Sequence, residues 1–252
     1  MLLTAGIASG GLALAYGGVA LRLNAKPRRY QDLTDDHLAE ISKTISEAPP
    51  PRVLVVGNSA TIESNFFAHL LTAAEAFEPH VTMVRASAGA ARLIETVRIS
   101  PFRRLLRDND WNAVVLQDFS TMPLRARDRL GSLVAVEAIS RMVSPASIVL
   151  FPHWPSAPGH PIYGKRAWFG AAHASSLADY ASKIRAHYSF VAKTTDAVVA
   201  PVLDQWLTAL SSGAQLYQAD LHHANETGAK LAANAVWQAM SDVLQAQRQR
   251  FE

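Results

Sequence analysis

The sequence predicts an α/β protein built on one parallel sheet. From residue 52 onward, short apolar and β-branched runs alternate with stretches of helical periodicity, a pattern typical of a parallel sheet covered by helices on both faces. The runs indicate buried strands because they are apolar on both faces. Five such runs suit a three-layer, doubly wound α/β/α arrangement of the flavodoxin-like type, with right-handed crossovers.

The elements follow in a regular order. The expected strands are residues 52–57, 81–86, 112–117, 147–152 and 197–202. The expected helices are residues 63–77, 91–108, 124–143, 177–193 and 225–249. In such sheets ligands bind beyond the carboxyl ends of the strands. A site is therefore expected in the loops that begin at Gly57, Ser87, Gln117, His153 and Leu203.

Residues 30–51 precede this pattern as a short amphipathic helix and a linker. Thr34 can cap the helix. Three prolines at 49–51 end it, because proline lacks an amide donor and restricts the residue before it. We place a domain boundary there, so that the α/β domain is residues 52–252.

Residues 1–29 form an apolar segment with a basic flank. Residues 2–21 carry no charge, and at roughly 1.5 Å per residue they would just cross a hydrocarbon core of about 30 Å. Gly18 and Ala20 also offer a weak signal-peptide cleavage site. The positive side chains follow the apolar run, which favours a cytoplasmic domain behind it. We expect membrane association or export, with the side of the membrane open; the alternative is a strand or helix packed on the domain.

Composition and charge exclude several classes of protein. The 252 residues are 49% hydrophobic and 18% charged, as in a globular chain and unlike a disordered or collagenous one. The chain has no cysteine, which excludes disulfides, cysteine nucleophiles and cysteine-based zinc sites. Four positive side chains within residues 1–29 account for the net charge of +3, and the rest of the chain is near −1. No nucleic-acid partner is therefore expected.

A serine follows the first predicted strand directly. In the stretch Gly57-Asn58-Ser59-Ala60, a tight turn would present the Ser59 hydroxyl at the start of a helix. Serine is a weak nucleophile without a base, so this interpretation needs a histidine. The alternative is a plain helix N-cap, a position that serine often takes.

An aspartate and a histidine lie three residues apart near the end of the chain. Asp220 and His223 stand on one loop before Asn225, which can cap the final helix. A hydrogen bond between them would fix the imidazole tautomer, which makes His223 a credible base for Ser59. The alternatives are two surface histidines beside a capping asparagine, or a metal site, for which the sequence offers no recognised ligand spacing.

Together these motifs resemble the SGNH hydrolases, the GDSL-like esterase and lipase family. The resemblance covers roughly residues 52–244, and the order and spacing of the motifs agree as well as the residue types. Three short motifs carry it: Gly57-Asn58-Ser59 after the first strand, Gly89 after the second, and Asp220-x-x-His223 before the last helix.

The resemblance implies a serine esterase mechanism. Ser59 would be the nucleophile, His223 its base, and Asp220 the carboxylate that orients the base. The backbone amides of Ser59 and Gly89 would form the oxyanion hole. No metal and no organic cofactor would be required.

One motif departs from the family. SGNH hydrolases usually carry Gly-x-Asn-Asp after the third strand, and its Asn side chain completes the oxyanion hole. This chain has Leu116-Gln117-Asp118-Phe119-Ser120 there, a pattern similar to that of a related branch of SGNH-like proteins. Two interpretations are open: Gln117 supplies the missing donor from a different backbone position, or Gln117 and Asp118 merely cap loops. If Gln117 does not supply it, the resemblance implies a weak activity or ligand binding alone.

Residues 153–169 form a loop rich in histidine, proline and aromatic residues. Exposed aromatics above the strand ends would suit sugar or acyl recognition, and the alternative is an aromatic cluster that packs the loop itself. Asn58, Asp118, His153 and Trp154 are the expected substrate contacts. The predicted function is hydrolysis of a carbohydrate or small acyl ester through an acyl-enzyme, in the cell envelope. Acyl transfer at the same site and a catalytically weak binding module are the alternatives.

Overall fold

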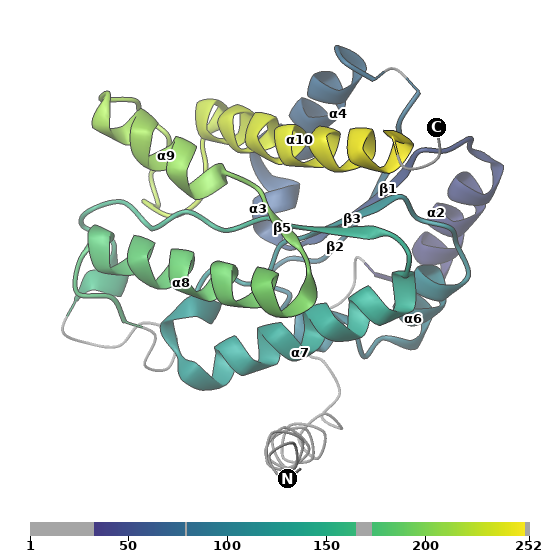
Figure 1. Cartoon of the computed structure of the whole chain (residues 1–252). Coiled ribbons are helices and arrows are strands. Elements are labelled where there is room, and N and C mark those ends of the chain that lie inside the picture. The colour runs from purple at the N-terminus through teal and green to yellow at the C-terminus, as the bar shows by residue number, and fades with distance from the viewer. Residues whose placement is uncertain (1–32, 79, 165–172, 250–252) are drawn as a thin grey trace, which may run out of the picture.

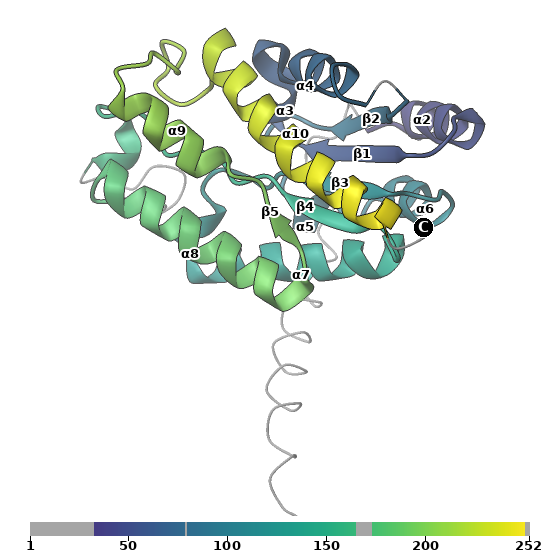
Figure 2. The same ribbon diagram turned by 45° about the horizontal axis from the view of Figure 1, so that its top comes forward.

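The structure is a computed structural model that describes residues 33–78, 80–164 and 173–249. Five strands form one parallel sheet in the order β2-β1-β3-β4-β5, with helices on both faces (Figure 1, Figure 2). The predicted three-layer α/β/α fold is confirmed. No helix in the described part of the chain is long and apolar enough to cross a membrane, and the predicted segment 1–29 lies outside that part.

The strands begin where the sequence predicts, to within one residue, and most are shorter. Their bounds are β1 Arg52–Gly57, β2 Thr82–Ser87, β3 Ala113–Leu116, β4 Ser147–Leu150 and β5 Val198–Val199. Val53 of β1 pairs with Met83 of β2 on one side and with Ala113 of β3 on the other. β5, predicted as residues 197–202, is only two residues long because Pro201 and a helix follow at once, and both of its valines are exposed at the sheet edge.

Several helices match the predicted ranges to within a few residues: α2 Asp35–Glu47, α7 Ala126–Val143, α8 Leu177–Thr195 and α10 Glu226–Gln249. Helix α9, Val202–Ser211, replaces a predicted loop. Two short 3-10 turns were not predicted: η2 Met122–Leu124, which ends at the first residue of the predicted helix 124–143, and η3 Pro161–Tyr163, which lies in a predicted loop.

Two predicted helices are broken by the backbone. The range 63–77 contains the 3-10 turn η1 Glu63–Asn65 and helix α4 Phe66–Glu75, and a short helix, α3 Ser59–Ile62, precedes it. The break arises because Ser64 and Asn65 adopt left-handed backbone angles, with φ of 50° and 57°. Residues 91–108 are divided into α5 Leu93–Thr96 and α6 Ser100–Arg107. Pro101 lies in the first turn of α6, where proline favours a helix start.

The alternation of side chains along the strands separates two apolar cores. Leu54 and Val56 of β1 lie in the core shared with α2, α5, α6, α7 and α8. Val53 and Val55 lie in the core shared with α4, α9 and α10. All four side chains are fully buried. Successive strand residues point to opposite faces, so both faces of the sheet are covered.

Helix α2 packs on the domain although three prolines separate it from β1. Thr34 caps the helix as predicted, because its Oγ1 accepts the backbone N–H of His37 at 3.2 Å. Leu38, Ile41 and Ile45 are buried in the core of one sheet face, where α2 contacts α6 and β2. The core therefore extends N-terminal of the predicted boundary at residues 49–51.

Candidate active site

The carboxyl end of β1 leads directly into the predicted nucleophile. Asn58 caps helix α3, since its Oδ1 accepts the backbone N–H of Ala60 at 3.3 Å, and Ser59 is the first residue of the helix. Gly57 is required by close packing, because a Cβ there would lie 2.5 Å from the Thr61 side chain. The N-cap role therefore belongs to Asn58, and the Ser59 hydroxyl is left for another partner.

Ser59, His223 and Asp220 form one hydrogen-bonded chain. His223 Nε2 lies 3.2 Å from Ser59 Oγ, and His223 Nδ1 lies 2.5 Å from Asp220 Oδ2. Asp220 Oδ1 also accepts the backbone N–H groups of His222 and His223, at 2.9 and 3.0 Å. Burial acts to raise the pKa of Asp220, but these hydrogen bonds outweigh it and lower the pKa to about 2. Asp220 is thus ionised near neutral pH and can orient the imidazole.

A second group of hydroxyls surrounds the neighbouring histidine. His222 Nε2 lies 3.2 Å from Ser120 Oγ, and His222 Nδ1 lies 2.8 Å from Ser156 Oγ. Ser120 is 5% exposed and Ser156 is fully buried, so an ester cannot reach either hydroxyl from solvent. Ser59 by contrast is half-buried, and the His223 side chain is 25% exposed. Of the serine–histidine pairs, the one at Ser59 has an approach for substrate.

Histidine rings stack behind the candidate site. The His222 ring centroid lies 5.0 Å from that of His153 and 5.3 Å from that of His160. Burial lowers the pKa of all three, and that of His222 falls to about 3. These rings are therefore neutral near pH 7 and pack against one another as uncharged rings. Within the described residues no group of three or more histidine, aspartate or glutamate side chains is arranged to hold a metal ion.

The predicted oxyanion donors lie on two neighbouring turns. Gly57 pairs in register with Ser87, so the turn with Ser59 adjoins the exposed turn with Gly89. No described residue accepts a hydrogen bond from the backbone N–H of Ser59 or of Gly89. A Cβ at Gly89 would meet nothing within 4 Å, so packing does not require glycine there. Both N–H groups remain available to a ligand.

Gln117 is buried under the nucleophile turn and is already engaged. Its Oε1 accepts the backbone N–H of Asn58 at 3.0 Å, and its Nε2 donates to the backbone oxygen of Asp118 at 2.5 Å. The side chain is 1% exposed. The structure therefore places Gln117 as a brace of the Gly57-Asn58-Ser59 turn, and its oxyanion-hole role stays a prediction.

The four predicted substrate contacts do not form the surface of the site. None is more than 3% exposed: Asn58, Asp118, His153 and Trp154. Trp154 stacks on Trp206 with ring centroids 4.2 Å apart, and its Nε1 donates to the backbone oxygen of His222 at 2.9 Å. The expectation of an exposed aromatic is wrong at Trp154, because the ring packs between α9 and the turn before α10. Residues 165–169 of the predicted loop lie outside the described residues.

The carboxylate of Asp118 serves the loop that follows β2. Its Oδ1 accepts the backbone N–H of Leu93 at 3.0 Å and that of Phe119 at 2.7 Å. Burial raises the pKa of Asp118. The contacts tie the end of β3 to α5, which positions the turn that carries Gly89 rather than a substrate.

Two residues near the candidate triad, Glu63 and His222, were not among the predicted site residues. Glu63 Oε1 lies 3.6 Å from His223 Nε2. Glu63 follows Ser59 by four residues, and the helix expected to start at Ser59 would have placed both on one face if it had been extended to Glu63. His222 carries no such signal, because its partners Ser120 and Ser156 come from distant loops.

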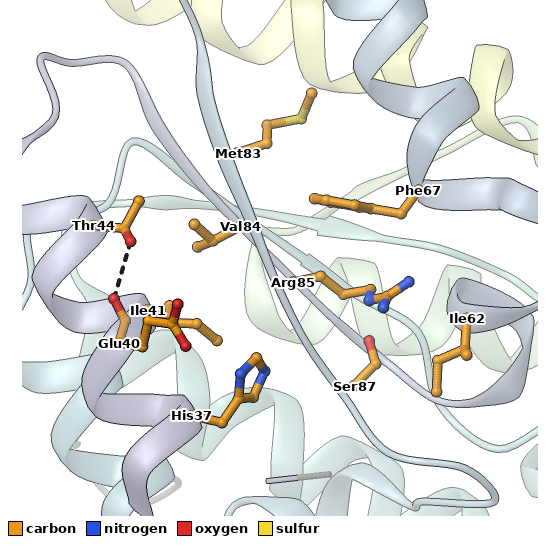
Figure 3. A pocket seen from close by; sticks show the side chains of 10 residues that line it. All are labelled: His37, Glu40, Ile41, Thr44, Ile62, Phe67, Met83, Val84, Arg85 and Ser87. Carbon is orange, nitrogen blue, oxygen red and sulfur yellow. Dashed lines mark hydrogen bonds between the residues drawn. The ribbon is translucent and has the colours of Figure 1, made fainter. Parts of the chain in front are cut away.

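A groove of about 640 Å³ runs along the outer edge of β2, between α2 and α4 (Figure 3). Its wall mixes apolar and polar side chains about equally, and the Arg85 guanidinium lies over the Phe67 ring at 5.4 Å. Ile62 and Ser87 bound one end, close to each other in Figure 3. That end adjoins helix α3, which begins at Ser59.

Comparisons with known proteins concern the fold. No protein-family model and no curated protein matches the sequence. Among solved structures, a proposed SGNH hydrolase from Slackia heliotrinireducens aligns over 76% of this chain and 100% of its own, with a TM-score of 0.63 and 23% identity. The psychrotrophic esterase EstA from Pseudoalteromonas sp. covers 78% of this chain and 100% of its own, at TM-score 0.55 and 15% identity.

An acetylxylan esterase from Geobacillus stearothermophilus has the same arrangement. It aligns over 77% of this chain and 95% of its own, with a TM-score of 0.54 and 12% identity. At these identities the likeness establishes the architecture, and the chemistry depends on the residues described above. The structural neighbours are SGNH hydrolases and GDSL-like esterases, and this chain has their fold.

Proposed function

We propose that the protein is a serine esterase that cleaves a carbohydrate or small acyl ester. The carrying observation is the hydrogen-bonded chain from Ser59 through His223 to Asp220 at the carboxyl end of β1, in which Ser59 is only half-buried. The shared fold with an acetylxylan esterase and with EstA supports an ester substrate.

The reaction proceeds through an acyl-enzyme. His223 Nε2 accepts the proton of Ser59 as Oγ attacks the ester carbonyl carbon, and the Ser59 and Gly89 amides bind the developing oxyanion. The carbon–oxygen bond to the alcohol then breaks, and His223 returns the proton to the leaving alcohol. Water next attacks the acyl-serine while His223 accepts its proton, and the acid is released.

A catalytically weak binding domain is the second candidate. It is favoured by one observation, the engagement of the Gln117 amide within the protein, which leaves two backbone donors for the oxyanion. Such a domain would bind an acylated ligand without Ser59-dependent turnover.

Steady-state hydrolysis of p-nitrophenyl acetate and of acetylated xylo-oligosaccharides tests the proposal. Ser59→Ala should lower kcat/KM by at least about a thousandfold. Ser211→Ala, at an exposed helix position, is the matched control and should match the wild type. Equal rates for the wild type and Ser59→Ala would overturn the esterase proposal, and binding without turnover would favour the second candidate.

A further inference from the structure

A carboxylate that the proposed mechanism does not use stands at the same imidazole. Glu63 Oε1 lies 3.6 Å from His223 Nε2, the atom that faces Ser59 Oγ at 3.2 Å. The Glu63 side chain is 39% exposed and that of His223 is 25% exposed. Glu63 therefore lies at the solvent-facing mouth of the site, beside the atoms that would react.

The turn that carries Glu63 is fixed to the catalytic loop. Ser64 and Asn65, which follow it, are held in the left-handed region with φ of 50° and 57°. Non-glycine residues persist there only when their surroundings enforce it. Ser64 Oγ donates to the backbone oxygen of Ala224 at 2.5 Å and accepts from Gln218 Nε2 at 2.9 Å. Both partners flank His223 in the sequence, so these hydrogen bonds fix the position of the turn relative to His223.

The mouth of the site carries an excess of negative charge. Glu63 and Asp220 each have a carboxylate oxygen within 4 Å of a His223 ring nitrogen, and neither pairs with a lysine or arginine in the described ranges. One imidazole can offset at most one of the two carboxylates. A fixed negative charge beside the reacting atoms repels anionic groups and attracts cationic ones, most strongly at low ionic strength.

We propose that Glu63 is a specificity-determining residue that disfavours esters with a negative charge next to the scissile bond. The inference rests on the proposed function and narrows its substrate class to neutral or cationic esters. An acetylated neutral sugar or amino sugar belongs to this class, and an ester with a carboxylate or phosphate near the carbonyl does not. The interaction of the Glu63 carboxylate with one unit charge on the ester, a few ångströms away, changes kcat/KM by roughly threefold to tenfold.

The test compares Glu63→Gln with the wild type on matched esters. p-Nitrophenyl butyrate and mono-p-nitrophenyl succinate share a leaving group and differ in an acyl carboxylate. Acetylcholine and 3,3-dimethylbutyl acetate share a shape and differ in a positive charge. Glu63→Gln should raise the succinate-to-butyrate ratio of kcat/KM roughly threefold to tenfold and lower the ratio of acetylcholine to its neutral analogue. Glu47→Gln, exposed on α2, is the control and should leave both ratios unchanged.

The outcomes separate this inference from the proposed function. If no ester is hydrolysed in a Ser59-dependent way, the proposed function fails. If turnover depends on Ser59 but Glu63→Gln changes charged and neutral esters by the same factor, the specificity role is overturned and the esterase stands. A second measurement needs no variant: for the wild type, raising the salt concentration should raise the succinate-to-butyrate ratio, and a constant ratio would contradict the inference.

Discussion

At the scale of single residues, the chemistry depends on which atoms are already engaged. Both ring nitrogens of His223 have partners, Asp220 at Nδ1 and Ser59 at Nε2. An ionised carboxylate only accepts hydrogen bonds, so the neutral imidazole carries its hydrogen on Nδ1 and presents a lone pair to Ser59. That tautomer is the one a general base requires.

Asp220→Asn tests this assignment. An amide can donate to Nδ1 and so stabilise the wrong tautomer, and we expect kcat to fall by about a thousandfold to ten-thousandfold with little change in KM. Asp36→Asn, at an exposed position of α2, is the control. A loss smaller than about tenfold at Asp220, measured with p-nitrophenyl acetate, would remove the tautomer argument.

For Gln117, in contrast, both ends of the side-chain amide are hydrogen-bonded to the backbone of the protein. Gln117→Ala leaves the buried backbone N–H of Asn58 without an acceptor, so we expect the free energy of unfolding to fall by about 1–3 kcal/mol along with turnover. Urea denaturation of this variant and of Gln215→Ala, an exposed control, measures the difference. Lost turnover at unchanged stability would instead favour the predicted oxyanion role.

At the scale of elements, the loop after β4 holds the turn that bears the candidate base. Trp154 Nε1 donates to the backbone oxygen of His222 at 2.9 Å, and Ala157 N–H donates to that of Leu221 at 2.8 Å. Ser156 adds a side-chain contact to His222. The described start of this loop, for which the sequence left substrate recognition and internal packing open, is thus an internal support.

Ser156→Ala tests this support. The variant removes a hydrogen bond from a buried imidazole, so we expect a loss of about 1–3 kcal/mol in the free energy of unfolding and a lower kcat. Reaction with a fluorophosphonate should persist, because the nucleophile is untouched. Ser46→Ala, exposed on α2, provides the baseline. Stability equal to that baseline would show that the contact does not support the turn.

The element scale also shows what periodicity can and cannot predict. The strand runs are apolar on both faces. That pattern predicts a sheet with both faces covered by helices, wherever each helix begins and ends. The break at Ser64 and Asn65 leaves no such pattern, because it depends on partners that flank His223. The burial of Trp154 is equally non-local, since Trp206 comes from a helix that the sequence did not predict. The predicted triad residues lie together because Ser59 follows the carboxyl end of β1 and the turn between α9 and α10 brings Asp220 and His223 to it.

At the scale of the whole molecule, buried histidines link folding to pH. In the folded protein burial lowers the pKa of His222 to about 3, whereas a histidine in an unfolded chain titrates near about 6.5. Below about pH 6.5 the unfolded chain therefore binds a proton that the folded protein does not. The free energy of unfolding falls as the pH falls from that value towards 3.

His222→Gln removes the contribution of His222 to this dependence. Between about pH 7 and about pH 5 the wild type should lose about 2 kcal/mol more of its free energy of unfolding than the variant does. His37→Gln, at an exposed position, should follow the wild type. Urea denaturation at the two pH values measures the difference, and parallel losses in all three proteins would contradict it.

The central claim is that the accessible Ser59, and no buried serine, is the nucleophile. Labelling with a fluorophosphonate probe, followed by mass spectrometry of the modified peptide, tests it most directly. We predict that the probe modifies Ser59 in the wild type, that Ser59→Ala is not labelled, and that Ser120→Ala and Ser156→Ala are labelled as the wild type is. Labelling that survives in Ser59→Ala, or that maps to Ser120 or Ser156, would contradict the account.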